Sequence, residues 1–401
     1  MNIAVAQSGG PTCAINASLV GVFRQALKTP EIDAVFGSIN GIEGIIKDEL
    51  IDLKLVIKTN EDMELLRQTP STVLGSCRYK LPDADSGAEV YEKILSCFEK
   101  HRIEAFFYIG GNDSMDTVVK LSAYLKEKGS SVRVIGIPKT IDNDLPVTDH
   151  TPGFGSAAKY VAATVQEIIR DSSVYSIESI TIIEIMGRHA GWLTASTCVL
   201  KANDEIAPHL IYLPEREFSV EKFIEDVRAM QAKHKAVVIA VSEGVEIPAS
   251  EDGFRSGAVD NFGHKYLSGI GKALEQILRE KIGCKVRSIE LNVMQRCSSH
   301  ICSKTDIDEA EEIGAKGVAA ALAGETGKTM VFKRISSVPY VVTVESVDAD
   351  KVANKEKFFP DEWINPQGNN VTEAAIEYFL PLIQGDVKIA MRNGMPLHFK
   401  L

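Results

Sequence analysis

The sequence contains no run of about 18 apolar residues, so it predicts no membrane-spanning helix. Cationic side chains are also few, since 44 Lys and Arg stand against 55 Asp and Glu and the net charge is −11. A chain with this balance offers no diffuse basic surface for nucleic acid or for an anionic membrane. Anionic small molecules remain possible ligands, provided that a few local Lys and Arg residues hold them.

Cysteine is scarce and follows no pattern. The seven Cys residues are scattered and odd in number, which is typical of reduced thiols rather than of a disulfide framework. The stretch "RCSSHIC", with Cys297, His300 and Cys302, has the atom types of a metal site, but its spacing matches no familiar ligand pattern. The first residues, "MNIAVAQSGGPT", have neither the basic nor the apolar region of a signal peptide, so we expect a cytoplasmic protein.

The order of apolar and amphipathic stretches predicts an α/β protein. A chain of 401 residues is long enough for two domains of this class. Short runs rich in Val and Ile alternate with longer amphipathic stretches, which indicates parallel sheets covered by helices. The expected strands are Ile3–Gln7, Ala105–Ile109, Val132–Ile137, Ser179–Ile185, Ala236–Ser242, Val286–Val293 and Val338–Val344. The expected helices are Ala14–Lys28, Ser86–Lys100, Met115–Lys128, Ser156–Asp171, Val220–Lys233, Gly269–Lys281, Asp308–Ala323 and Val371–Gln384. The stretch "EDGFRSGAVDNFG" (251–263) is the best candidate for a long exposed loop.

Two glycine-containing turns near strand ends need separate interpretations. In "AVAQSGGPTCAIN" a strand ends, Gly9 and Gly10 form a tight turn, and a helix begins, which is either an anion site or a plain strand–helix turn. The stretch "GETGKT" (324–329) looks like a phosphate-binding P-loop, but that motif needs a glycine where Leu322 stands. It also follows a helix and precedes a strand, the reverse of the required order, so we predict a helix–strand turn.

A second double glycine lies in "YIGGNDSMD" (108–116). Gly110 and Gly111 allow a ligand to approach the main chain, while Asp113, Ser114 and Asp116 crowd the start of the next helix. Helix capping by these polar residues is the simpler alternative. Capping alone does not need two glycines.

The densest polar cluster follows a buried strand in "IGIPKTIDNDLP" (135–146). Lys139, Thr140, Asp142, Asn143 and Asp144 come directly after that strand. In doubly wound folds, this edge of the sheet is where ligands bind. Two carboxylates two residues apart can act as a general base and as a metal ligand or substrate-orienting group. This pattern favours a functional site.

Candidate anion-binding groups follow further strands. "IIEIMGRHAGW" places Arg188 at a strand end, and Arg is the natural bidentate partner of a phosphate. Arg78 in "GSCRYK" and Arg296 in "VMQRCS" are further candidates, with a solvated Arg as the alternative for each. Glu243, in "AVSEG", is either a sugar-hydroxyl acceptor or a helix cap.

Together these motifs resemble the phosphofructokinase family, most specifically in "PKTIDND" and "MGRHAGW". The resemblance runs from the first strand to about Arg296. It implies two similar three-layer α/β domains with mostly parallel sheets and the active site in the cleft between them. It also implies a phosphoryl-donor domain at 1–150, a sugar-phosphate domain at 151–290 and a shared C-terminal segment at 291–401. The reaction implied is phosphorylation of the 1-hydroxyl of fructose 6-phosphate with Mg²⁺.

The resemblance also implies roles for individual residues. Asp142 is similar to the general base that takes the proton from the sugar hydroxyl. The implied sugar-phosphate contacts are Thr140, Ile141, Asp144, Met186, Gly187, Arg188, Glu243 and, for the 6-phosphate, Arg296. Gly10, Arg78 and the turn at Gly111 resemble the donor side, with Asn112 and Asp113 at the position of the metal-associated groups.

Two positions resemble the pyrophosphate-dependent members of the family. ATP-using relatives have glycine where this chain has Asp113, and again where it has Lys139. A carboxylate at 113 fills the space of a nucleotide phosphate and repels it. A Lys at 139 can pair with Asp113 and stabilise the transferring phosphoryl group. We therefore expect reversible phosphoryl transfer from pyrophosphate, with Asp113, Lys139 and Asp142 as the catalytic groups.

The chain departs from the family pattern at several positions. Asn112 replaces the metal-associated acid, while Ser179 and Val293 replace an Arg and a His that contact the sugar phosphate in many relatives. Only Arg24 matches the two effector-site arginines of allosteric relatives, since the other aligns with Val20, so we expect weak or no nucleotide control. The resemblance implies a homodimer or homotetramer. The alternatives are an ATP-dependent 6-phosphofructokinase, a pyrophosphate-dependent kinase of another sugar phosphate such as sedoheptulose 7-phosphate, and a non-catalytic subunit.

Overall fold

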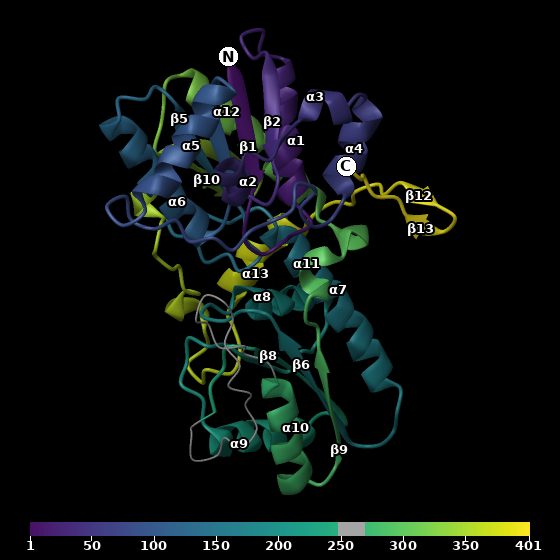
Figure 1. The fold of residues 1–401 in the computed structure, drawn as a ribbon. Coiled ribbons are helices and arrows are strands. Elements are labelled where there is room, and N and C mark those ends of the chain that lie inside the picture. Colours follow the sequence, from purple (N-terminus) through teal and green to yellow (C-terminus); the bar gives the residue numbers. More distant parts are fainter. Residues whose placement is uncertain (248–268) are drawn as a thin grey trace.

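The computed structural model of the chain describes residues 1–247 and 269–401, and the loop expected at 251–263 lies outside these residues. The described residues form an α/β fold in which the two main sheets lie in separate halves of the molecule (Figure 1). Most strand pairs in both sheets are parallel, which confirms the predicted fold class. In the described part of the chain, no helix combines the length and the apolar character needed to cross a bilayer.

The first sheet has the strand order β11-β10-β5-β4-β1-β2-β3. Its strands are β1 (Asn2–Gln7), β2 (Ala34–Ser38), β3 (Leu50–Asp52), β4 (Ile103–Gly110), β5 (Arg133–Pro138), β10 (Lys328–Ser337) and β11 (Tyr340–Asp348). Only the edge strands β3 and β11 pair antiparallel among the described strands of this sheet. The parallel strands β1, β4 and β5 therefore end at the same edge.

Helices cover both faces of the first sheet because strand side chains alternate between two cores. Ile3 and Val5 of β1 join the core beneath α1 (Ile15–Leu27) and α12 (Lys304–Leu322). Ala4 and Ala6 join the opposite core with α5 (Ala88–Lys100) and α6 (Asn112–Glu127). Helices α1 and α12 pack closely at Gly21, where an added Cβ would lie 1.9 Å from the Glu311 carbonyl oxygen.

The second sheet has the order β7-β8-β6-β9 and is parallel throughout its described strands. Its strands are β6 (Ser179–Ile185), β7 (Leu210–Tyr212), β8 (Ala236–Ser242) and β9 (Lys285–Glu290). Helices α7 (Phe154–Ser173) and α8 (Trp192–Ala195) share a core with one face. Helices α9 (Val220–Gln231) and α10 (Ile270–Lys281) share a core with the other.

The C-terminal part of the chain contributes to both halves. Strands β10 and β11 extend the first sheet, whereas α13 (Glu373–Phe379) places Phe379 in the core of the second half. The segment between β11 and α13 passes from one half to the other (Figure 1). This crossing segment brings residues from the end of the chain to the junction of the two halves.

Several predicted elements have different bounds in the structure. Helix α6 begins at Asn112 rather than at Met115, and α12 begins at Lys304 because the Ser303 side chain accepts from the Asp306 N–H as a cap. The strand expected at 286–293 ends at Glu290 and is followed by α11 (Met294–Cys297). The strand expected at 338–344 is part of a β10–β11 hairpin whose turn holds residues 338–339.

Two predicted elements lie in the C-terminal third of the chain. The expected helix at 371–384 is the shorter α13, continued by a 3-10 turn at Leu380–Ile383 that has a proline in its first turn. The predicted helix–strand turn at "GETGKT" is confirmed, because α12 ends at Leu322 and β10 begins at Lys328. The short elements β2, β3 and β7 and the helices α2 (Ile42–Lys47), α3 (Leu53–Val56) and α4 (Asn60–Gln68) were not predicted.

Candidate active site

Loops that follow the strands of both sheets line one cavity of about 700 Å³. The loops after β1, β4 and β5 contribute from the first half, and those after β6 and β8 from the second. The structure thus brings together nearly all of the residues singled out in the sequence. The predicted site residues that line the cavity are Gly10, Arg78, Asn112, Asp113, Lys139, Thr140, Ile141, Asp142, Asp144, Met186, Arg188, Glu243 and Arg296.

Basic side chains gather around the first glycine turn. Lys139 is 1% exposed, and its Nζ donates to the carbonyl oxygen of Gly10 over 2.5 Å. Burial lowers the pKa of Lys139 to about 8, against the opposing effect of the Asp142 charge. The Arg296 guanidinium is also close, since a Cβ added to Gly10 would lie 3.4 Å from Arg296 Nη1. Arg296 therefore lies beside the Gly10 turn, and its contact with the 6-phosphate stays a prediction.

The expected ion pair between Lys139 and Asp113 is not formed. Both residues lie in the described part of the chain, and the Lys139 ammonium instead bonds to the Gly10 carbonyl. Asp113 is exposed in the first turn of α6. It lines both the main cavity and a neighbouring one of about 120 Å³, which also contains Tyr79 and Tyr108. The carboxylate of Asp113 therefore stands where the two cavities meet.

The start of α6 is fixed to the end of β1. The Ser8 and Ser114 hydroxyls form a hydrogen bond of 2.5 Å. Gly110 is needed for this contact, because an added Cβ would lie 2.0 Å from Ser114 Oγ. Gly111 has more room, with Lys139 O as the nearest neighbour at 3.7 Å, and it lines the cavity. The double glycine thus has one packing role and one position open to a ligand.

Two carboxylates follow β5 on the loop at 139–144. The Asp142 N–H donates to Thr140 Oγ1 over 3.1 Å, and the Thr140 hydroxyl lies 3.4 Å from Asp142 Oδ2. Burial raises the pKa of Asp142 above its ordinary value. Burial and then the charge of Asp142 raise the pKa of Asp144 to about 7, and Glu356 adds to this effect. The cavity wall therefore carries two neighbouring carboxylates whose charged forms burial disfavours.

Lys357 forms hydrogen bonds to this loop and to the residues that follow it. Its Nζ donates to Asp149 O over 2.8 Å and to Thr148 O over 3.1 Å. Its main-chain N–H donates to the Asp144 carbonyl over 2.7 Å. Burial lowers the pKa of Lys357 to about 8, against the charge of Asp149. A cation from the C-terminal segment therefore fixes the conformation of the loop that carries Asp142 and Asp144.

The loop after β6 depends on Gly187. This residue has φ 141° and is packed so that a Cβ would lie 2.7 Å from Ala190 O. The Ser242 hydroxyl donates to Gly187 O over 2.6 Å, and the Gly187 N–H donates to Glu243 Oε1 over 3.3 Å. Gly187 is not itself among the lining residues, but it orients Met186 and Arg188, which are. Burial raises the pKa of Glu243 to about 7.

One wall of the cavity consists of residues that were not predicted from the sequence. Residues 354–358, which we call the C-terminal strap, contribute Asn354, Glu356 and Phe358 to the lining. His189 also lines the cavity, and its Nδ1 lies 2.8 Å from Glu356 Oε1. Alternate residues of the strap line the cavity, but the strap forms neither a helix nor a strand. No motif in the sequence marks this segment as part of a site.

The Asn112 side chain lines the cavity and also forms hydrogen bonds to the strap. Asn112 Nδ2 donates to Lys355 O over 2.7 Å, and Asn112 Oδ1 accepts from the Asn354 N–H. Asn354 Nδ2 adds a bond to Asp116 Oδ1 of 2.7 Å. Both polar atoms of the Asn112 amide therefore have main-chain partners, and its role as a metal ligand stays a prediction.

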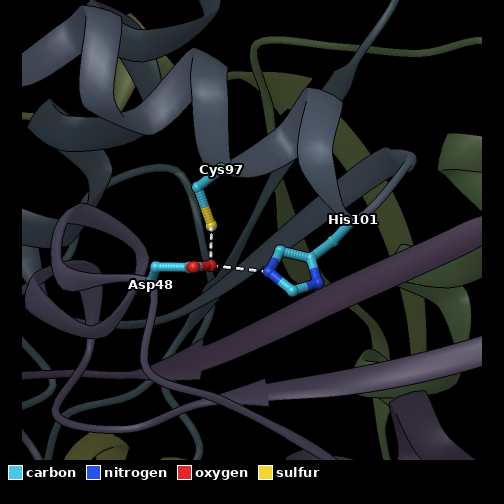
Figure 2. A group of neighbouring side chains, drawn as sticks. All are labelled: Asp48, Cys97 and His101. Carbon is cyan, nitrogen blue, oxygen red and sulfur yellow. Dashed lines mark hydrogen bonds and ion pairs between the residues drawn. The ribbon is translucent and has the colours of Figure 1, made fainter.

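A separate group of potential metal ligands lies outside the cavity, where α2 ends and α5 ends (Figure 2). His101 Nε2 lies 2.6 Å from Asp48 Oδ1, and Cys97 Sγ lies 3.7 Å from the same oxygen. Lys100 pairs with the other oxygen of Asp48. Burial raises the pKa of the Cys97 thiol to about 12. Since Asp48 is already neutralised by Lys100, this group is explained as a hydrogen-bonded ion-pair cluster.

Comparison with known proteins gives consistent results. Residues 2–321 match the family model described as phosphofructokinase. The chain is 39% identical over 406 residues to pyrophosphate–fructose 6-phosphate 1-phosphotransferase of Halomonas elongata, covering 100% of this chain and 96% of the relative. A relative of the same name from Xanthomonas campestris is 39% identical over 404 residues, with the same coverage of both chains.

The fold is similar to that of the crystal structure of a pyrophosphate-dependent phosphofructokinase from Marinobacter aquaeolei. The TM-score is 0.88 at 36% identity, covering 100% of this chain and 95% of the other. The matching family model and the relatives that align along the whole chain agree with the strand-end motifs and with the cavity that they form. The chain therefore belongs to the phosphofructokinase family.

Proposed function

We propose that the protein transfers a phosphoryl group from pyrophosphate to the 1-hydroxyl of D-fructose 6-phosphate, reversibly, giving fructose 1,6-bisphosphate and phosphate. The observation that carries the proposal is the donor end of the cavity, where the buried cation Lys139 lies at the Gly10 turn and Asp113 lines the same cavity. Relatives that align along the whole chain carry the name of this activity. On this proposal residues 1–150 bind the donor, 151–290 bind the sugar phosphate, and 291–401 serve both.

The donor end has the charge that a short polyphosphate requires. Lys139, Arg78 and Arg296 line the cavity near the Gly10 turn, and the positive charges of Arg296 and Arg78 act on Lys139. A transferring phosphoryl group gains charge on its oxygens, and fixed cations offset that charge without reorganising. Asp113 makes the neighbouring cavity unfavourable for a further phosphate group by charge repulsion. Pyrophosphate fits these constraints better than ATP does.

Asp142 is the proposed general base. Asp142 lines the cavity, and the hydrogen bonds with Thr140 set its orientation. Burial raises its pKa, which brings its basicity closer to that needed to accept a proton near neutral pH. As the sugar 1-hydroxyl attacks the phosphorus atom, its proton passes to an Asp142 carboxylate oxygen. In the reverse reaction Asp142 returns that proton to the leaving alkoxide.

The sugar phosphate is proposed to bind against the loop after β6. Met186, Arg188 and Glu243 line that side of the cavity. Arg188 offers the guanidinium for an anionic group, and Glu243 offers a carboxylate for sugar hydroxyls. Arg296 lies on the Gly10 side, so its charge is available to the donor as well as to the sugar phosphate.

The side-chain oxygen atoms that line the cavity fit Mg²⁺ as ligands. Carboxylate oxygens of Asp113 and Asp144 line it, and such hard oxygen ligands are those that Mg²⁺ prefers. Among the described residues, no side chain hydrogen-bonds to the Asp144 carboxylate. When bound, Mg²⁺ neutralises charge on the donor oxygens. The protein residues then position the donor and exclude water.

Initial rates with a series of donors and acceptors test the proposal. With fructose 6-phosphate and Mg²⁺, we expect a high rate with pyrophosphate and almost none with ATP. Fructose 1,6-bisphosphate and phosphate are expected to give pyrophosphate in the reverse direction. A preference for ATP, or for sedoheptulose 7-phosphate over fructose 6-phosphate, would replace the proposal by one of the alternatives. Sedimentation analysis of the same sample tests the expected homodimer or homotetramer.

A further inference from the structure

Position 112 has lost a charge that the family pattern places beside the metal. The chain has Asn where the resemblance implies an acid, and the amide is committed on both sides to the C-terminal strap. Neutral Asn oxygen atoms bind Mg²⁺ more weakly than carboxylates, and this one already accepts a hydrogen bond from Asn354. A replacement for the lost carboxylate is therefore expected from another element of the cavity wall.

The strap brings an acid to the same part of the cavity. Glu356 lines the cavity together with Asp144. The next residue, Lys357, donates its main-chain N–H to the Asp144 carbonyl over 2.7 Å, so the main chain at Glu356 is held beside the loop that carries Asp144. The Asn112 amide holds the two residues before Glu356. Glu356 is therefore fixed on both sides by hydrogen bonds to the two loops that flank the donor end.

One oxygen of the Glu356 carboxylate has a hydrogen-bond partner. Oε1 lies 2.8 Å from His189 Nδ1, and Oε2 has no partner among the described residues. The side chain is 38% exposed and faces the cavity. A carboxylate held through one oxygen can present the other to a cation. The Glu356–His189 pair differs from an ion pair on the open surface, because the negative charge of Glu356 also raises the pKa of a second carboxylate, Asp144.

We propose that Glu356, together with Asp144, holds the Mg²⁺ of the donor complex and replaces the acid that position 112 lacks. On this view Asn112 is a positioning residue, which acts by fixing the strap. Water and donor oxygens would complete the oxygen-rich coordination that Mg²⁺ requires. The inference deepens the proposed function and rests on it, because it assigns the metal of that same donor site.

The test measures how strongly Mg²⁺ and a pyrophosphate analogue promote each other's binding. Isothermal titration with imidodiphosphate, once in excess Mg²⁺ and once in EDTA, gives two dissociation constants. Their ratio reports the metal's contribution without any turnover. Glu356→Gln removes the charge, whereas Glu356→Asp keeps the charge and withdraws the oxygens by one methylene group. His189→Ala removes the ion-pair partner and leaves the carboxylate. Glu362→Gln, at an exposed position outside the cavity, is the matched control for loss of an acid.

We expect Mg²⁺ to tighten imidodiphosphate binding by the wild type, and both Glu356 variants to reduce that effect about tenfold or more. His189→Ala and Glu362→Gln are expected to keep it within about threefold. If Mg²⁺ tightens imidodiphosphate binding by Glu356→Asp as much as by the wild type, only the charge of Glu356 matters and not a contact with the metal. If His189→Ala loses this tightening as fully as the Glu356 variants do, the ion pair with His189 accounts for it. If Mg²⁺ does not tighten binding by the wild type, the site does not exist. Each of these results would overturn the inference, and a matching melting temperature for each variant excludes misfolding. The donor assay tests the proposed function separately.

Discussion

The ammonium of Lys139 lies 2.5 Å from the carbonyl oxygen of Gly10 and not against Asp113. The cation therefore faces the turn after β1, where a donor phosphate would replace the carbonyl as its partner. Asp113 is left exposed at the boundary of two cavities. These two residues, which the sequence suggested as an ion pair, are separate in the structure. On the proposed mechanism Lys139 provides charge for the transferring group, and Asp113 limits what else can enter.

Replacing Lys139 tests its proposed role. Lys139→Gln removes the buried cation and keeps hydrogen-bonding capacity toward Gly10. We expect kcat/KM for pyrophosphate to fall about 10²- to 10³-fold, in line with the loss of one preorganised electrostatic contact in an active site. Lys128→Gln, at the end of α6, is the control for loss of a lysine. Steady-state kinetics with either substrate varied would reveal the effect, and a change of less than threefold would contradict the assignment.

The lowered pKa of Lys139 predicts a pH dependence. Burial lowers this pKa to about 8, so the free enzyme loses the cation as the pH rises through that value. Catalysis needs the protonated form, and kcat/KM for pyrophosphate should therefore fall above pH 8. A pH profile of wild type and Lys139→Gln would check this. The variant has no ammonium to titrate, so persistence of the same alkaline limb would assign the limb to another group.

Asp142→Asn tests the general base. The substitution keeps the size of the side chain and removes its ability to accept a proton. We expect kcat to fall about 10²- to 10⁴-fold, the usual contribution of general base catalysis. The affinity for fructose 6-phosphate, measured by calorimetry, should change little. Retention of more than a tenth of wild-type kcat would show that another group takes the proton.

A buried histidine links the same loop to α12 and predicts how stability varies with pH. His150 Nε2 lies 2.7 Å from Glu309 Oε2, and its Nδ1 lies 2.9 Å from Asp149 Oδ2. Burial opposes protonation, but the charges of Glu309 and Asp149 raise the pKa of His150 to about 9. The folded-state pKa exceeds the ordinary value, so this stabilisation is complete below about pH 6.5 and is lost as the pH rises toward 9.

His150→Gln should remove that dependence. Loss of the cation leaves Asp149 and Glu309 without a shared partner, and breaking such a buried pair costs about 3 to 5 kcal/mol. Urea unfolding at pH 6.5 and pH 9 measures both effects. We expect a large loss of unfolding free energy at pH 6.5 and a smaller loss at pH 9. An equal loss at the two values would show that His150 contributes packing rather than charge.

The parts of the site carried by strand ends could be predicted from sequence. The loops after β4, β5 and β6 follow continuous apolar runs, and parallel strands bring their carboxyl ends to one edge of a sheet. This is why Asp113 and Asp142 were expected near each other, whereas Arg188 follows β6 of the second sheet and was expected at the same site from the family resemblance. The helix bounds were less accurate where capping decides them, as at Ser303.

The C-terminal strap could not be predicted for a physical reason. Asn112 and Asn354 are 242 residues apart in the sequence, and their contact depends on how the two halves are packed. The strap has no helical period and forms no strand, so it has no local signature. The Lys139–Gly10 bond is similarly non-local, since its partners are 129 residues apart in the sequence. Such contacts follow from the assembled fold rather than from any short motif.

The central claim is that Asp113 sets the choice of phosphoryl donor. The most direct measurement is the ratio of kcat/KM for pyrophosphate to that for ATP, in wild type and in Asp113→Gly, with fructose 6-phosphate and Mg²⁺ held constant. Asp113 lines both the main cavity and its smaller neighbour, so its removal frees space at their shared wall and removes the repulsion. We predict a ratio far above one for the wild type and a fall of at least about 100-fold in the variant, mainly through new activity with ATP. A wild type that prefers ATP, or an unchanged ratio in the variant, would contradict the account.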